Sequence, residues 1–130
     1  MENLDIQPTS NTPKVDFNAG TGKLLFSGRS IPEDPGEFYD RILSWLEKYF
    51  KATNQETELE FRLEYANSGS SKYILEILKD ISDYTEGKNI KVIWGYEADD
   101  ESIEELGELY QNSVNLPIEL KEFEDEENDE

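Results

Sequence analysis

Residues 58–65 alternate between charged and apolar side chains, and this pattern constrains the fold more than any other part of the chain. Four apolar residues would share one face of an extended strand: Leu59, Phe61, Leu63 and Tyr65. The residues between them are all charged. A strand with one polar face belongs to a sheet of which one side meets solvent or a partner. We therefore expect helices to cover only one face of the sheet.

Strand patterns and helical patterns alternate along the rest of the chain. The expected strands are 4–6, 15–17, 24–26, 57–65, 91–96 and 117–123. Apolar residues at helical spacing predict one helix from Pro35, capped by Asp34, to about Lys51. A second helix follows a group of serines and stops at Gly87, and Asp99 or Asp100 caps a third. This order predicts a single α/β domain with a mixed β-sheet and helices mainly on one face.

The charge of the chain is strongly negative. The 130 residues include 31 acidic and 12 basic side chains, which gives a net charge of −19. Residues 122–130 hold seven acidic residues and no basic one, so we expect a domain over 1–121 and a disordered acidic tail over 122–130, with an interaction role for the tail as the alternative. Neither nucleic acid nor an anionic membrane is an expected partner, because both require a basic surface.

The chain lacks the residues that most catalysts use. It has no cysteine and no histidine, which excludes disulfides, thiolate metal sites and the commonest general base. No carboxylate pair suited to catalysis is recognisable, so we expect no enzymatic activity, no cofactor and no metal. No apolar run approaches the ~20 residues of a membrane span, and the first residues do not resemble a signal peptide. We expect a cytoplasmic protein.

The junction between the central strand and the second helix is the main candidate site. Four residues there could cap the helix: Asn67, Ser68, Ser70 and Ser71. A helix start also presents free N–H groups and a positive dipole end, which suit a phosphate, bound or covalent. In that case Gly69 would allow close backbone approach and Lys72 could pair with the phosphate.

Three other groups of residues have a simple structural explanation and a functional alternative. Arg29, in an expected connector over 29–35, could bind loop carbonyls or be a second phosphate partner. The acidic run at 99–101 fits helix capping better than metal binding, since its spacing does not match an EF-hand loop. Glu58, Glu60 and Glu64 would form a solvated sheet face or an acidic docking surface.

Three segments together resemble the SiaC family of bacterial regulatory phosphoproteins, whose fold is similar to the STAS domain of anti-sigma-factor antagonists. The first runs from Gly28 to Pro35 and continues with Glu37-Phe38-Tyr39 and Trp45-Leu46. The second runs from Leu63 to Lys72. The third comprises Trp94-Gly95-Tyr96-Glu97, Asp99-Asp100-Glu101 and Glu108. The segments span nearly all of the chain before the acidic tail.

The resemblance implies a partner switch. A SiaC-like protein is phosphorylated by a dedicated kinase just after the Asn of the second segment, and a PP2C-type phosphatase reverses this. The unphosphorylated form binds and activates a diguanylate cyclase, which promotes cyclic-di-GMP signalling and biofilm formation. The position carried over is Ser68, with Ser70 and Ser71 as alternatives. The family commonly has Thr there and Ser next, whereas this chain has Ser68 and Gly69, and Ala66 replaces a bulkier apolar residue.

Asn67, Gly69, Lys72 and Arg29 are then the expected phosphate or partner contacts. A phosphate adds about 1.5 to 2 negative charges, about a tenth of the net charge of −19, so it must act by local contact. We expect Ser70 or Ser71 to cap the helix and Ser68 to lie one step outside it. Two other functions stay open: an anti-anti-sigma-like module that binds an anti-sigma kinase, and a small anion-binding domain.

Overall fold

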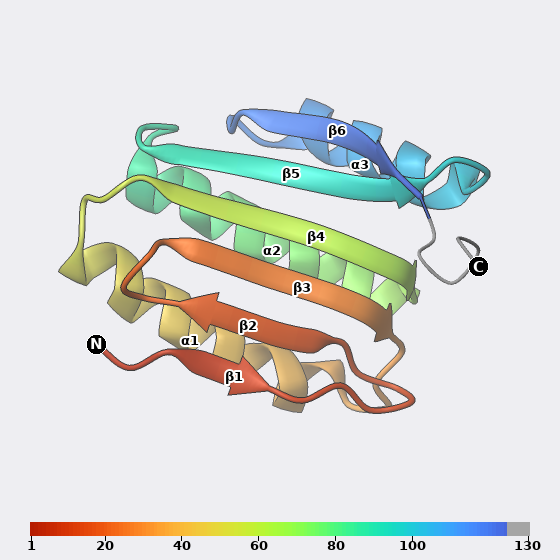
Figure 1. Ribbon diagram of the computed structural model, residues 1–130, viewed down its shortest axis with the longest axis horizontal. Helices are drawn as coiled ribbons and strands as arrows, with labels where there is room; N and C mark the ends of the chain where they lie inside the picture. Colours follow the sequence, from red (N-terminus) through yellow and green to blue (C-terminus); the bar gives the residue numbers. More distant parts are fainter. Residues whose placement is uncertain (125–130) are drawn as a thin grey trace.

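The computed structural model describes residues 1–124. It contains six strands and three helices in the expected order (Figure 1). The strands are β1 (Leu4–Ile6), β2 (Lys14–Asn18), β3 (Lys23–Ser30), β4 (Thr57–Ala66), β5 (Ile90–Glu97) and β6 (Ile118–Phe123). The helices are α1 (Pro35–Ala52), α2 (Ser68–Thr85) and α3 (Glu101–Ser113).

All six strands form one mixed sheet in which spatial order equals chain order. The pairs β1–β2 and β2–β3 are antiparallel, and the pairs from β3 to β6 are parallel. Each parallel connection contains a helix, and crossovers of this kind are right-handed. Because the strand order always advances in one direction, all three helices lie on the same face (Figure 1). The predicted one-sided arrangement is confirmed, and we call the uncovered side the open face.

The core lies between the sheet and the helices. Residues in register on neighbouring strands point the same way, so Phe26, Phe61 and Trp94 form one buried row across β3, β4 and β5. The rings of Phe26 and Phe61 are stacked with centroids 5.0 Å apart. Burying aromatic rings of this size contributes much of the stabilisation of a small domain.

The central strand departs from the prediction at its end. The pairing of β3 with β4 shifts between Gly28, which lies beside Leu63, and Arg29, which lies beside Tyr65. Glu64 is therefore the extra residue of a β-bulge, and Gly28 has φ of 113°, a value that favours glycine. After the bulge the alternation is inverted: Tyr65 shares the open face with Arg29 and is 53% exposed. The expectation that Tyr65 faces the core is wrong.

One strand end differs from the expected bounds: Arg29 belongs to β3 and not to the connector that follows it. Strand β6 ends at Phe123, as expected for the strand 117–123, so it includes the first two residues of the expected tail. The Phe123 ring lies under the Arg62 guanidinium, whose central carbon is 4.9 Å from the ring centroid. The rest of the expected tail, residues 125–130, lies outside the described residues. Within residues 1–124, no helix is long and apolar enough to span a membrane.

Candidate functional site

The candidate site lies at the edge of the sheet where the parallel strands end. Strands β3, β4 and β5 end at this edge and are followed by the amino termini of α1, α2 and α3 (Figure 1). The edge is held together at its centre by a hydrogen bond from the backbone N–H of Asn67 to the carbonyl of Ser30, at 3.0 Å. This bond fixes the junction between β4 and α2 to the end of β3.

Asn67 is the N-cap of α2. Its side-chain oxygen accepts a hydrogen bond from the backbone N–H of Ser70 at 2.9 Å. The expectation that Ser70 or Ser71 caps the helix, with Ser68 outside it, is wrong: Ser68 is the first helical residue. Asn67 takes the role because it has the extended backbone that a cap requires, with φ of −76° and ψ of 174°.

Ser70 is fully buried, because it joins α2 to the core. Its hydroxyl donates to the carbonyl of Ser30 at 2.9 Å and lies 2.7 Å from the Ser30 hydroxyl, which in turn lies 2.6 Å from the Tyr39 hydroxyl. Burial raises the pKa of Tyr39, although its hydrogen bonds with Ser30 and Ser70 act in the opposite direction. These polar groups satisfy one another, so a modifying enzyme could reach Ser70 only if this part of the fold opened.

Ser71 is half-buried, and its hydroxyl and its backbone carbonyl both form hydrogen bonds. Its hydroxyl donates to the carbonyl of Asn67 at 3.0 Å, and its own carbonyl accepts from the Tyr110 hydroxyl at 2.8 Å. Burial raises the pKa of Tyr110 well above its usual range, so this donor keeps its proton at neutral pH. The first turn of α2 is thus tied to β3 through Ser70 and to α3 through Ser71.

Ser68 is the one serine of the junction that is exposed. Its hydroxyl makes no hydrogen bond with any of residues 1–124, and the first turn of α2 carries no acidic side chain. The N–H groups of the first turn that Asn67 does not satisfy point towards the same end of the helix. Position 68 can therefore hold an anion without displacing an existing contact.

The four expected phosphate or partner contacts do different things in the structure. Asn67 caps α2, and Gly69 lies against α1, where a Cβ atom would come within 2.9 Å of the Pro35 Cγ. Lys72 is exposed one turn after Ser68, on the same side of α2. Arg29 is exposed at the end of β3 and lies beside Tyr65. Neither cation forms an ion pair with any residue in the described part of the chain.

Several residues that shape this site were missed by sequence reasoning. The Ser30 hydroxyl contacts both the Ser70 hydroxyl, 40 residues later in the chain, and the Tyr39 hydroxyl, and no spacing rule connects these residues. Tyr65 reaches the open face only through the bulge. The sequence signal that could have indicated the bulge is Gly28, just before Arg29, since an isolated glycine in a strand often marks a bulge.

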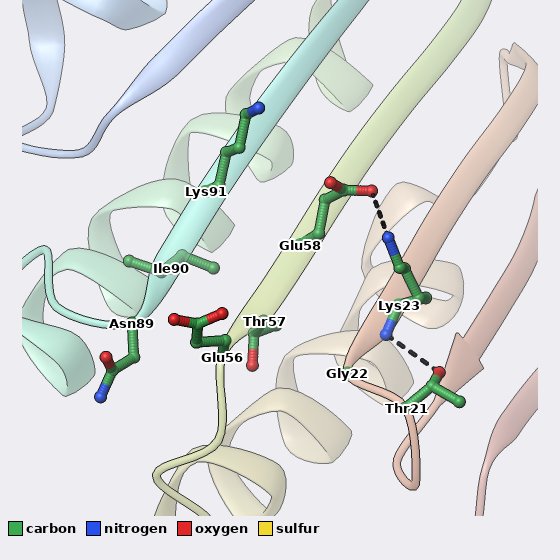
Figure 2. Close-up of a pocket in the computed structure, with 9 residues that line it drawn as sticks. All are labelled: Thr21, Gly22, Lys23, Glu56, Thr57, Glu58, Asn89, Ile90 and Lys91. Atoms are coloured by element: carbon green, nitrogen blue, oxygen red, sulfur yellow. Dashed lines mark hydrogen bonds and ion pairs between the residues drawn. The ribbon is translucent and has the colours of Figure 1, made fainter.

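A hollow with a volume of about 500 Å³ lies at the opposite edge of the sheet, where the parallel strands begin (Figure 2). In it Lys23 contacts Glu58 at 3.2 Å, and Lys91 extends from the neighbouring strand (Figure 2). Among residues 1–124 no cluster of acidic side chains could hold a metal ion, and Asp100 caps α3 by accepting from the N–H of Ile103 at 3.0 Å.

Comparisons with known proteins agree with this geometry. The structure is similar to SiaC of Pseudomonas aeruginosa, with a TM-score of 0.87, 26% identity, and coverage of 95% of this chain and 100% of that chain. It is also similar to a crystal structure of the diguanylate cyclase SiaD in complex with its activator SiaC from the same organism, with a TM-score of 0.86, 26% identity, and coverage of 92% and 99%.

The sequence gives the same result. An uncharacterized protein of Pseudomonas aeruginosa (strain UCBPP-PA14) is 27% identical over 122 residues, which is 93% of this chain and 97% of that protein. The model of the SiaC family regulatory phosphoproteins matches residues 6–123. With a match over nearly all of the described sheet and all three helices, the chain belongs to the SiaC family of regulatory phosphoproteins.

Proposed function

We propose that this chain is the non-enzymatic activator of a diguanylate cyclase, and that phosphorylation of Ser68 turns the activation off. A dedicated protein kinase adds the phosphate and a PP2C-type phosphatase removes it, in the cytoplasm. The unphosphorylated form binds the cyclase and raises the output of cyclic-di-GMP. The observation that carries the proposal is the similarity to SiaC as it is found in complex with the cyclase SiaD.

Burial and hydrogen bonding support Ser68 as the modified residue. Ser70 is fully buried and Ser71 is engaged with the Asn67 carbonyl, whereas the Ser68 hydroxyl is exposed. A phosphate at the first helical position gains about 0.3–1 kcal/mol from the helix dipole. The modification is therefore compatible with the folded domain, and the signal does not require unfolding.

The cost of the phosphate falls on the partner. A cyclase surface that packs over Ser68 would have to remove water from a dianion or supply basic groups to meet it, and an unmatched buried charge is strongly unfavourable. The long-range field changes little, because the chain already carries −19. The switch thus depends on direct contact at the start of α2.

The test measures cyclic-di-GMP formed from GTP by the diguanylate cyclases of the host, with and without this protein. Three forms are compared: unmodified protein, Ser68→Ala, and protein with phosphoserine incorporated at position 68. We expect the first two to stimulate one cyclase equally and the third to lose at least tenfold in stimulation.

Phosphoserine at position 102 is the matched control. Ser102 is also exposed in the first turn of a helix, α3, so the added charge and the helix position are similar. We expect this form to stimulate the cyclase normally. Full stimulation by the form phosphorylated at Ser68 would refute the switch, and failure of unmodified protein to stimulate any host cyclase would refute the activator role.

A further inference from the structure

The β-bulge of the central strand brings an aromatic and a cation together on the open face. Tyr65 lies beside Arg29 in the register of β3 with β4, so the two side chains are neighbours across the strands. Tyr65 is 53% exposed and belongs to a small set of large apolar side chains exposed in residues 1–124, with Met1, Tyr84 and Leu109. Bulges often re-aim a side chain at a functional site.

Arg29 is one of eight basic side chains that form no ion pair within residues 1–124. Four other basic side chains each contact a carboxylate: Lys23, Lys51, Arg62 and Lys91. Arg29 is exposed and contacts no carboxylate of residues 1–124. Its guanidinium can therefore form a bidentate pair with a carboxylate from another molecule.

The strand ends that carry this pair meet at the junction that precedes Ser68. The backbone hydrogen bond between the Asn67 N–H and the Ser30 carbonyl joins the two strand ends at 3.0 Å. Arg29 immediately precedes Ser30, and Ser68 immediately follows Asn67, so both flank the same bond. An Arg side chain is long enough to serve either a partner on the open face or a phosphate at the start of α2.

We propose that Tyr65 and Arg29 form the anchor that binds an acidic segment of the diguanylate cyclase, and that a phosphate on Ser68 competes with that segment for Arg29. This inference rests on the function proposed above. Tyrosine and arginine are, with tryptophan, the side chains enriched at energetic hot spots of interfaces. We take the partner segment to be acidic because Arg29 is an exposed cation without an ion-pair partner in residues 1–124 and lies beside the exposed Tyr65.

The competition follows from the charges. In the unphosphorylated protein, Arg29 and Lys72 have no carboxylate partner within the described residues. A phosphate on Ser68 lies one helical turn from Lys72 and close to the end of β3, so it draws on both cations. Its two negative charges and three acceptor oxygens make it a stronger ligand for arginine than a carboxylate. The phosphate thus repels the acidic segment of the partner and also occupies the Arg29 guanidinium to which that segment would bind.

Glu64 provides a test of whether the partner segment is negatively charged. It is the extra residue of the bulge, it is exposed, and it is adjacent to Tyr65 in the chain. Its negative charge opposes the binding of an acidic segment at short range. Neutralising it should strengthen the complex, and a gain in affinity cannot be produced by misfolding.

The experiment measures the affinity of the full-length protein for the cyclase that it activates, by titration calorimetry. Tyr65→Ala and Arg29→Gln are each expected to weaken binding at least tenfold. Glu64→Gln is expected to strengthen it at least twofold. Tyr84→Ala is the matched control: Tyr84 is also an exposed tyrosine, but it lies near the end of α2 remote from Ser68, and its loss should change affinity less than twofold.

Phosphoserine at position 68 is then combined with Arg29→Gln. We expect phosphorylation to weaken binding by a smaller factor in this variant than in wild type, because Arg29 is no longer available to be withdrawn. Equal factors would overturn the competition. Wild-type affinity in Tyr65→Ala or Arg29→Gln, or weaker binding by Glu64→Gln, would overturn the proposed anchor. The proposed function would still stand if the wild-type protein binds the cyclase and loses affinity when Ser68 is phosphorylated. If wild type binds no cyclase, the proposed function itself fails.

Discussion

Substituting Ser68 by aspartate should stabilise the domain. Ser68 is the first residue of α2, and no acidic side chain occupies the first turn of that helix. The Ser68 hydroxyl makes no hydrogen bond with residues 1–124, so its replacement breaks no contact. An aspartate at this position gains about 0.3–1 kcal/mol from the helix dipole and the free N–H groups.

The same substitution at the other end of a helix provides the matched control. Ser113 is the last residue of α3 and is also exposed. Aspartate there meets the negative end of the dipole and loses the hydrogen bond from the Ser113 hydroxyl to the Leu109 carbonyl at 2.6 Å. We expect Ser113→Asp to lose about 0.3–1 kcal/mol. Because both variants carry the same added charge, their difference cancels the general repulsion within an acidic chain.

The assay is thermal unfolding at low ionic strength. A chain of 130 residues shifts its Tm by about 4 °C for each kcal/mol of stability. We expect the Tm of Ser68→Asp to exceed that of Ser113→Asp by about 2–8 °C, and the gap to narrow as salt screens the dipole. If Ser68→Asp is no more stable than Ser113→Asp, the assignment of Ser68 to an available helix start is wrong. Phosphorylation there could then act by weakening the fold.

Two further predictions concern the core and its tyrosines. Gly107→Ala should destabilise the protein by about 1–3 kcal/mol in urea unfolding. The reason is that a Cβ atom at this position would overlap the buried Trp94 indole and come within 2.6 Å of Leu120 Cδ2. Combining it with Trp94→Phe should reduce this loss of stability, because the smaller ring leaves room for the Cβ atom. A penalty unchanged by Trp94→Phe would contradict this. Burial raises the pKa of Tyr39 and Tyr110, so both favour the folded state below pH 10, their ordinary value, and this contribution is lost as the pH rises further. Stability should fall between pH 10 and 12, and absorbance at 295 nm should show these two tyrosines ionising only with unfolding.

Much of the fold was predictable because it depends on local patterns. Alternation in 58–65 indicated a one-sided sheet, and apolar spacing indicated three helices: one from Pro35, one after the group of serines, and one capped by Asp99 or Asp100. Three segments together, of which Leu63 to Lys72 is one, suggested the family, which the match over residues 6–123 confirmed. The assignment of phosphorylation to Ser68, and of phosphate contacts to its neighbours, stays a prediction.

The sequence by itself determined which residues could be phosphorylated as a switch: the serines grouped at the start of the second helix. It also showed that the chain has no histidine and no cysteine. Only the tertiary structure decided which of these serines is buried and which is exposed. Ser70 is buried, and Ser30, distant in the chain, supplies its hydrogen-bond partners and is itself bonded to Tyr39, whereas Ser68 is left exposed. The bulge likewise moved Tyr65 from the predicted core face to the open face. The periodicity of the sequence cannot predict the burial of Ser70 or the exposure of Tyr65, because both depend on how separate strands are paired.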